Sequence, residues 1–187
     1  MPKILTPAQA MEHLAPLGLS VGDWNEIKDL NVHPDEYRWQ QFRPGRDVNL
    51  LHNFALWALS SLPSGEWKIL QFDNSTALGE VEHALIGKFL ASPDVGAPDI
   101  HREKTFLFDC QEPIVGDILI ANLIFLVLMF EGHAYVTSSE SRNGERLAIQ
   151  DGFVDFLSRG NFDGWQRSIE NFERDPMRRP SSFQGLE

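Results

Sequence analysis

The stretch from His133 to Ser158, HAYVTSSESRNGERLAIQDGFVDFLS, constrains the fold of this chain more than any other part of the sequence. It contains three short runs of alternating apolar and polar residues, which are separated by SRNGE and by QDG. Asn-Gly and Asp-Gly are strong hairpin signals, because a type I′ turn needs positive φ at both central residues. The stretch therefore predicts a three-stranded antiparallel meander.

Helices and further strands are predicted along the rest of the chain. Thr6 followed by Pro7 marks the start of a helix that ends near Leu14. We expect one α+β domain over residues 1–175, in which a mainly antiparallel sheet, meander included, packs against several helices, and a flexible tail over 176–187. The spacing of apolar residues predicts a weak strand at 37–42, a helix at 47–62, a central strand at 66–72, a helix at 77–90, a strand at 104–110, a buried helix at 115–130 and a last helix at 163–174.

The charge of the chain limits its possible partners. It has 16 Lys and Arg against 27 Asp and Glu, a formal net charge of −11. Nucleic acids and anionic membranes are bound by basic surfaces, so both are excluded as expected partners. The segment after residue 173 holds Arg174, Arg178 and Arg179, which leaves the rest of the chain more acidic still. A basic protein is the partner that this charge favours.

Cysteine usage and apolar runs indicate a compartment. Cys110 is the only cysteine, which excludes an intramolecular disulfide and a cysteine-based zinc site. The first residues, MPKILTPAQAMEHL, lack the basic and apolar regions of a signal peptide. The most apolar run, from Ile118 to Phe130, is shorter than the ~20 residues that cross a bilayer. We therefore expect a cytoplasmic protein.

A polar group stands where the predicted strand at 66–72 meets the following helix. Asp73-Asn74-Ser75-Thr76 are residue types that accept hydrogen bonds from the first N–H groups of a helix, and we interpret them as its cap. Glu80 and His83 follow at the i, i+3 spacing of carboxylate-bridged di-metal bundles. Such a site needs the motif twice, and no second Glu-x-x-His occurs. No metal or other cofactor is predicted.

The sequence assigns no catalytic residue. Cys110 ends an apolar strand in an acidic chain, which favours a buried structural thiol over a nucleophile. No G-x-S-x-G, P-loop, G-x-G-x-x-G or H-E-x-x-H motif is present. An enzyme that uses clustered carboxylates with a divalent metal stays open as an alternative, if four aspartates converge in space. These are Asp73, Asp109, Asp117 and Asp151.

Residues 23–39 are the strongest candidate for a binding site. They interleave three aromatic residues with five acids, against only two basic residues. Trp and Tyr are common interface anchors, and flanking acids suit a basic partner. The competing interpretation is a solvated loop whose aromatic side chains fold back into the core. The predicted partner-binding residues are Asp23, Trp24, Glu26, Asp29, Asp35, Glu36, Tyr37 and Trp39.

Two stretches, WKILQFDNST and FEGHAYVTSSESRNGERLAIQDGFVDFLS, carry a resemblance of type. With its small, acidic and cysteine-poor α+β character, the chain resembles the immunity proteins of bacterial polymorphic-toxin and contact-dependent inhibition systems. The resemblance implies a cytoplasmic inhibitor that occludes a toxin domain, often a basic nuclease, and it assigns no functional residue. The alternatives are the carboxylate enzyme and an accessory or structural subunit without catalysis.

Overall fold

The computed structural model describes residues 2–30, 38–73, 105–110, 113–160 and 162–184. The predicted α+β fold is confirmed, and within the described residues every strand pairing is antiparallel. The helices are α1 (Pro7–Leu14), α2 (Val48–Ser60), α4 (Pro113–Met129) and α5 (Asp163–Arg174). The strands are β1 (Lys3–Leu5), β2 (Leu19–Val21), β3 (Ile27–Asp29), β4 (Arg38–Phe42), β5 (Trp67–Phe72), β6 (Thr105–Asp109), β7 (Ala134–Ser138), β8 (Arg146–Gln150) and β9 (Phe153–Ser158).

Seven strands form the main sheet in the order β1-β6-β5-β7-β8-β9-β4, and β2 and β3 form a separate hairpin. The predicted meander is confirmed as β7-β8-β9. Asp151 and Gly152 both have positive φ (51° and 78°), as the turn between β8 and β9 requires. Between β7 and β8 the connection is longer, and of its Asn-Gly pair only Gly144 has positive φ (66°).

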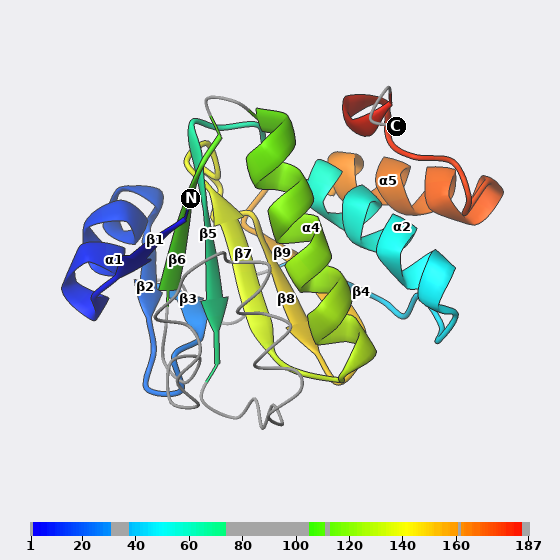
Figure 1. Ribbon diagram of the computed structural model, residues 1–187. Helices are drawn as coiled ribbons and strands as arrows, with labels where there is room; N and C mark the ends of the chain where they lie inside the picture. The colour runs from blue at the N-terminus through cyan, green and yellow to red at the C-terminus, as the bar shows by residue number, and fades with distance from the viewer. Residues whose placement is uncertain (1, 31–37, 74–104, 111–112, 161, 185–187) are drawn as a thin grey trace.

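The two faces of the main sheet are covered differently (Figure 1). Helices α2, α4 and α5 pack on one side, here the helix face, where Phe54, Phe72 and Trp165 have no exposed surface. Helix α1 and the β2–β3 hairpin pack on the other side, here the hairpin face, around Ile69 and Ala148. The apolar residues of α4 are spread around the whole helix, which fits its packing against both the sheet and α2.

Local sequence signals explain several helix ends. Thr6 and Gln9 form a capping box at α1: the N–H of Gln9 donates to Thr6 Oγ1 (3.3 Å), and the N–H of Thr6 donates to Gln9 Oε1 (2.9 Å). Asp47 caps α2 through Oδ1, which accepts from the N–H groups of Asn49 (2.9 Å) and Leu50 (3.3 Å). Both predicted helix starts are confirmed. The predicted helix at 77–90 lies outside the described residues.

The segment after α5 has defined contacts with α2. We expected a flexible tail over 176–187, whereas the structure places 176–184 along the helix. Phe183 is 3% exposed and belongs to the core of the helix face. Trp57 Nε1 and Asn53 Nδ2 each donate to the carbonyl oxygen of Arg178 at 2.8 Å. An apolar side chain and two buried donors thus hold a segment whose composition suggested fraying.

In the part of the chain that the structure describes, no helix combines the length and the apolar character needed to cross a lipid bilayer.

Candidate functional site

The tip of the β2–β3 hairpin carries part of the predicted binding segment. Asp23 is exposed there, and Trp24 is 67% exposed. Glu26 stabilises the tip through contacts within the hairpin. Its Oε2 accepts from the N–H of Trp24 (2.9 Å), and its Oε1 lies 3.9 Å from Lys28 Nζ. The tip therefore exposes the Trp24 indole beside the Asp23 carboxylate, and this indole does not contribute to core packing.

Trp39 lies on β4, the last strand at one edge of the main sheet, and is 63% exposed. Phe42, three positions later, stacks on Phe54 of α2 with ring centroids 5.0 Å apart, so Phe42 points to the helix face. Side chains alternate along a strand, and Trp39 therefore points to the hairpin face. Neither Trp24 nor Trp39 folds back into the core.

The two tryptophans fall within the footprint of one protein interface. Asn25 Nδ2 donates to the carbonyl oxygen of Phe72 (2.7 Å), which fixes the hairpin tip at the end of β5. Four strand spacings separate β5 from β4, or roughly 19 Å at about 4.8 Å each. A standard interface covers about 800 Å² per partner, a patch roughly 30 Å across. One partner can therefore contact both tryptophans.

Buried polar groups fasten the hairpin to the sheet. The main-chain oxygen of Asn25 accepts from Gln71 Nε2, and Thr105 Oγ1 donates to Gln71 Oε1 at 3.1 Å. Gln71 has no exposed surface, and Thr105 is buried. Each partner satisfies the next, as buried polar networks require. No local pattern in the sequence indicates this network, because its members come from three separate segments.

Asp29 belongs to the same anchorage. Its side chain has no exposed surface, and its Oδ2 accepts from Arg146 Nη1 at 2.9 Å, while Arg159 Nε lies 3.5 Å from Oδ1. Burial raises the pKa of the Asp29 carboxyl against the opposing effect of the two guanidinium groups, and burial lowers the pKa of Arg146. Asp29 thus holds β3 on the sheet, and we leave it out of the surface that a partner touches.

The four aspartates considered as a metal site divide into two groups at opposite ends of β5. Asp73, which follows β5, and Asp151 flank His133, with Oδ2–Nδ1 at 3.8 Å and Oδ1–Nε2 at 3.0 Å. Asp109 and Asp117 lie near the start of β5, where Asp117 Oδ1 is 2.7 Å from Lys68 Nζ. Among the described residues, no group of three or more His, Cys, Asp or Glu side chains is arranged to hold a metal ion.

Cys110 lies beside the ion pair of Lys68 and Asp117 in the interior. Its Sγ is 3.9 Å from Lys68 Nζ and 3.7 Å from Asp117 Oδ1, and the residue is 5% exposed. Burial raises the pKa of the thiol to about 11, although Lys68 opposes the rise. Such a thiol stays protonated and is a poor nucleophile at neutral pH.

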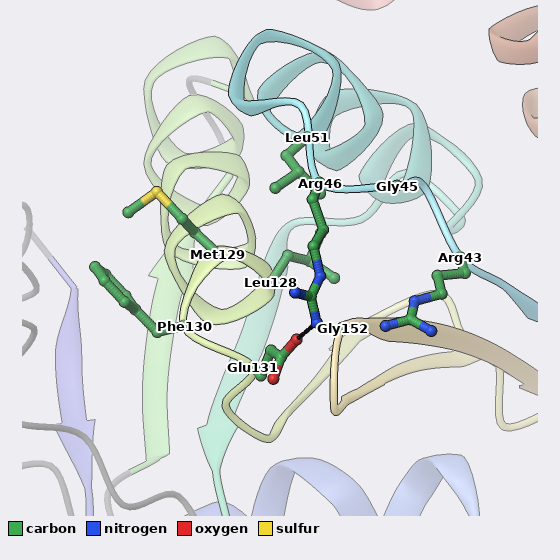
Figure 2. Close-up of a pocket in the computed structure, with 9 residues that line it drawn as sticks. All are labelled: Arg43, Gly45, Arg46, Leu51, Leu128, Met129, Phe130, Glu131 and Gly152. Atoms are coloured by element: carbon green, nitrogen blue, oxygen red, sulfur yellow. Dashed lines mark hydrogen bonds and ion pairs between the residues drawn. The ribbon is translucent and has the colours of Figure 1, made fainter.

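A cleft of about 380 Å³ opens between the β4–α2 loop and the end of α4 (Figure 2). Figure 2 shows Arg46 reaching across it to Glu131, where the two side chains form a 2.7 Å ion pair. Arg43 stands on the far side of Gly152 and lies over the Phe153 ring, 4.7 Å from its centroid. Both arginines are thus engaged within the chain.

Comparison of the chain with protein-family models, with characterised proteins and with solved structures finds no match. The candidate surface consequently rests on geometry: Asp23 and Trp24 on the hairpin tip and Trp39 on β4. Asp35, Glu36 and Tyr37 lie outside the described residues, as do 74–76, Glu80 and His83 from the strand-to-helix junction.

Proposed function

We propose that this chain is an acidic binding protein of the immunity type, which neutralises a basic toxin domain, such as a nuclease, by occluding it. The observation that carries the proposal is the pair of tryptophans, 67% and 63% exposed at positions 24 and 39. Trp is the residue most enriched at binding hot spots. Two indoles left in solvent by a well-packed chain are better explained by a partner than by the fold.

Charge selects the kind of partner. The net charge of −11 repels acidic proteins and attracts basic ones at long range. At short range, Asp23 stands next to Trp24 at the exposed tip, where its carboxylate can pair with a Lys or Arg around the indole. Such pairs at the rim of an interface mainly raise the association rate, and salt screens them. We therefore expect fast, salt-sensitive association.

The anchorage of the hairpin supports a binding role. The buried contacts of Asn25 and Asp29 fix both ends of the hairpin on the sheet. Because Trp24 sits on a backbone that is already ordered, little conformational entropy is lost when a partner closes over it. The alternative, an enzyme with clustered carboxylates, has less support. The four candidate aspartates lie in two pairs at opposite ends of β5, so a catalytic site could contain only two of them. No contact in the described residues favours the accessory subunit.

The test is capture followed by inhibition. The full chain is immobilised, a lysate of the source cells is passed over it at low and high salt, and each retained protein is then purified. We expect a basic protein whose own activity, nucleolytic or other, is blocked by a stoichiometric amount of this chain. Retention of acidic proteins only, or of a basic protein whose activity is unchanged, would refute the proposed inhibitory function.

Variants locate the interface in the same assay. Trp24→Ala and Trp39→Ala should each weaken the complex by about 30-fold or more, the equivalent of about 2 kcal/mol at a hot spot. Met177→Ala is the matched control, because Met177 is 68% exposed and lies on the segment against α2, away from the hairpin face. Equal effects of all three substitutions would show that the partner binds elsewhere.

A further inference from the structure

A second site lies at the opposite side of the fold, where α5 ends. A hollow of about 200 Å³ opens there between α2, α5 and the segment that follows α5. Three arginines line it, in a chain that has an excess of acid everywhere else. Its lining includes Trp57, Asn171, Arg174, Arg178, Arg179 and Ser181.

The backbone that carries these arginines is held in place. The carbonyl oxygen of Arg178 accepts two hydrogen bonds at 2.8 Å, from Trp57 Nε1 and from Asn53 Nδ2. The N–H of Arg178 donates to the carbonyl of Asp175 (3.1 Å), and Phe183 is buried in the core just beyond. The backbone that lines the hollow is therefore part of the folded structure.

Two of the arginines, Arg174 and Arg178, have no acidic partner among the residues that the structure describes. Glu170 stands one turn before Arg174, the favoured arrangement for an ion pair on a helix, yet its Oε1 accepts from Gln166 Nε2 at 3.0 Å instead. In the described part of the chain, no carboxylate forms an ion pair with Arg174 or with Arg178. Asp175 is the single acid among the lining residues, against three guanidinium groups. The carbonyl end of α5 carries a partial negative charge, which offsets part of the repulsion among the three guanidinium groups.

We propose that this hollow binds a phosphate dianion, either free or as the terminal phosphoryl group of a small molecule. Guanidinium groups match phosphate oxygens with paired N–H donors, and the Ser181 hydroxyl and the Asn171 amide add uncharged donors. The volume of about 200 Å³ holds a phosphoryl group together with a small group attached to it. Binding at this hollow does not depend on the hairpin face or on a protein partner.

The indole of Trp57 provides a local reporter. Its N–H is already hydrogen-bonded to the Arg178 carbonyl at the wall of the hollow. In ¹⁵N-labelled full-length protein at pH 7.5 and constant ionic strength, titration with inorganic phosphate should shift this indole resonance along a saturable curve. A dissociation constant of about 1 mM or tighter is expected for several charge-assisted contacts. The indole resonances of Trp24 and Trp39 should stay in place.

Variants and a second ligand complete the test. Arg178→Gln should weaken phosphate binding at least tenfold, and Arg174→Gln with Arg178→Gln should abolish it, while Arg142→Gln on the β7–β8 connection should leave it unchanged. Thermal midpoints within about 2 °C of the parent establish that the variants fold. Glycerol 3-phosphate binding more tightly than phosphate identifies a phosphoryl ester, and the reverse order identifies the free anion.

Three results would overturn the proposal: a Trp57 shift that does not saturate, an equal response to acetate, or phosphate affinity that survives the double substitution.

Discussion

Replacing Arg146 by Met should lower the free energy of unfolding by about 3 kcal/mol. The side chains of Asp29 and Arg146 are 0% and 5% exposed, so the substitution leaves a carboxylate in the interior without its main partner. Removing one member of a buried pair costs about 3–5 kcal/mol. Arg159, 3.5 Å from Asp29 and 30% exposed, compensates in part and places the expected value near the lower limit.

The cost should also depend on pH. Burial raises the pKa of Asp29, and loss of Arg146 raises it further, because an opposing positive charge is removed. The carboxyl then takes up a proton in the folded state at a higher pH than in the unfolded chain. The penalty is therefore fully present above the folded pKa of Asp29 and shrinks as the pH falls through it.

Urea unfolding followed by far-ultraviolet circular dichroism measures these effects, together with a thermal midpoint about 6–12 °C lower for a chain of this size. Asp29→Leu combined with Arg146→Met should cost much less than Arg146→Met alone, since no buried charge is left unpaired. Arg142→Met is the matched control: Arg142 is 81% exposed in its pair with Glu140 and should cost under about 0.5 kcal/mol. A loss below 1 kcal/mol for Arg146→Met would refute the buried pair as the anchor of the hairpin.

Other contacts give smaller effects that can be measured separately. Because burial raises the pKa of the Cys110 thiol from 9.0 to about 11, its stabilising contribution is complete below pH 9 and is lost as the pH rises through 11. We expect a fall of about 1 kcal/mol between pH 8 and 10 in urea unfolding, absent in Cys110→Ala; identical pH profiles would contradict this. Deleting residues 180–187 removes Phe183 and should cost about 2–4 kcal/mol, which thermal unfolding checks; an unchanged midpoint would mean that Phe183 does not pack. Asp47→Ala should cost ~1 kcal/mol and Asp47→Asn less, whereas equal losses would exclude the cap as the cause.

Turn and cap chemistry made much of the fold predictable. Asp151-Gly152 specifies a two-residue hairpin, because few other residue pairs accept positive φ at both positions. Thr6-Pro7 and Asp47 specify helix starts through hydrogen bonds between residues two or three positions apart. In each case the interaction that decides the structure is local, so a short stretch of sequence contains it.

The candidate surface was only partly predictable. Each strand of the β2–β3 hairpin has three residues, too few to show a period. Asp29 looks like its acidic neighbours in the sequence, and only its pairing with Arg146, 117 positions away, places it in the interior. The exposure of Trp24 and Trp39 likewise depends on which face each reaches after the hairpin docks. Long-range packing decides these positions, and local pattern does not contain it.

The order of strands in the main sheet has a consequence during synthesis. Both edge strands come from the first 42 residues, yet Lys3 pairs with Leu107 and Arg38 pairs with Ser158. At about 5–20 residues per second, roughly a hundred intervening residues take about 5–20 s to translate. Throughout that interval the amino-terminal segment, with both of its tryptophans, is outside the ribosome without the strands it will join. Nascent chains that stop before β9 should therefore keep β4 open to protease and to chaperones.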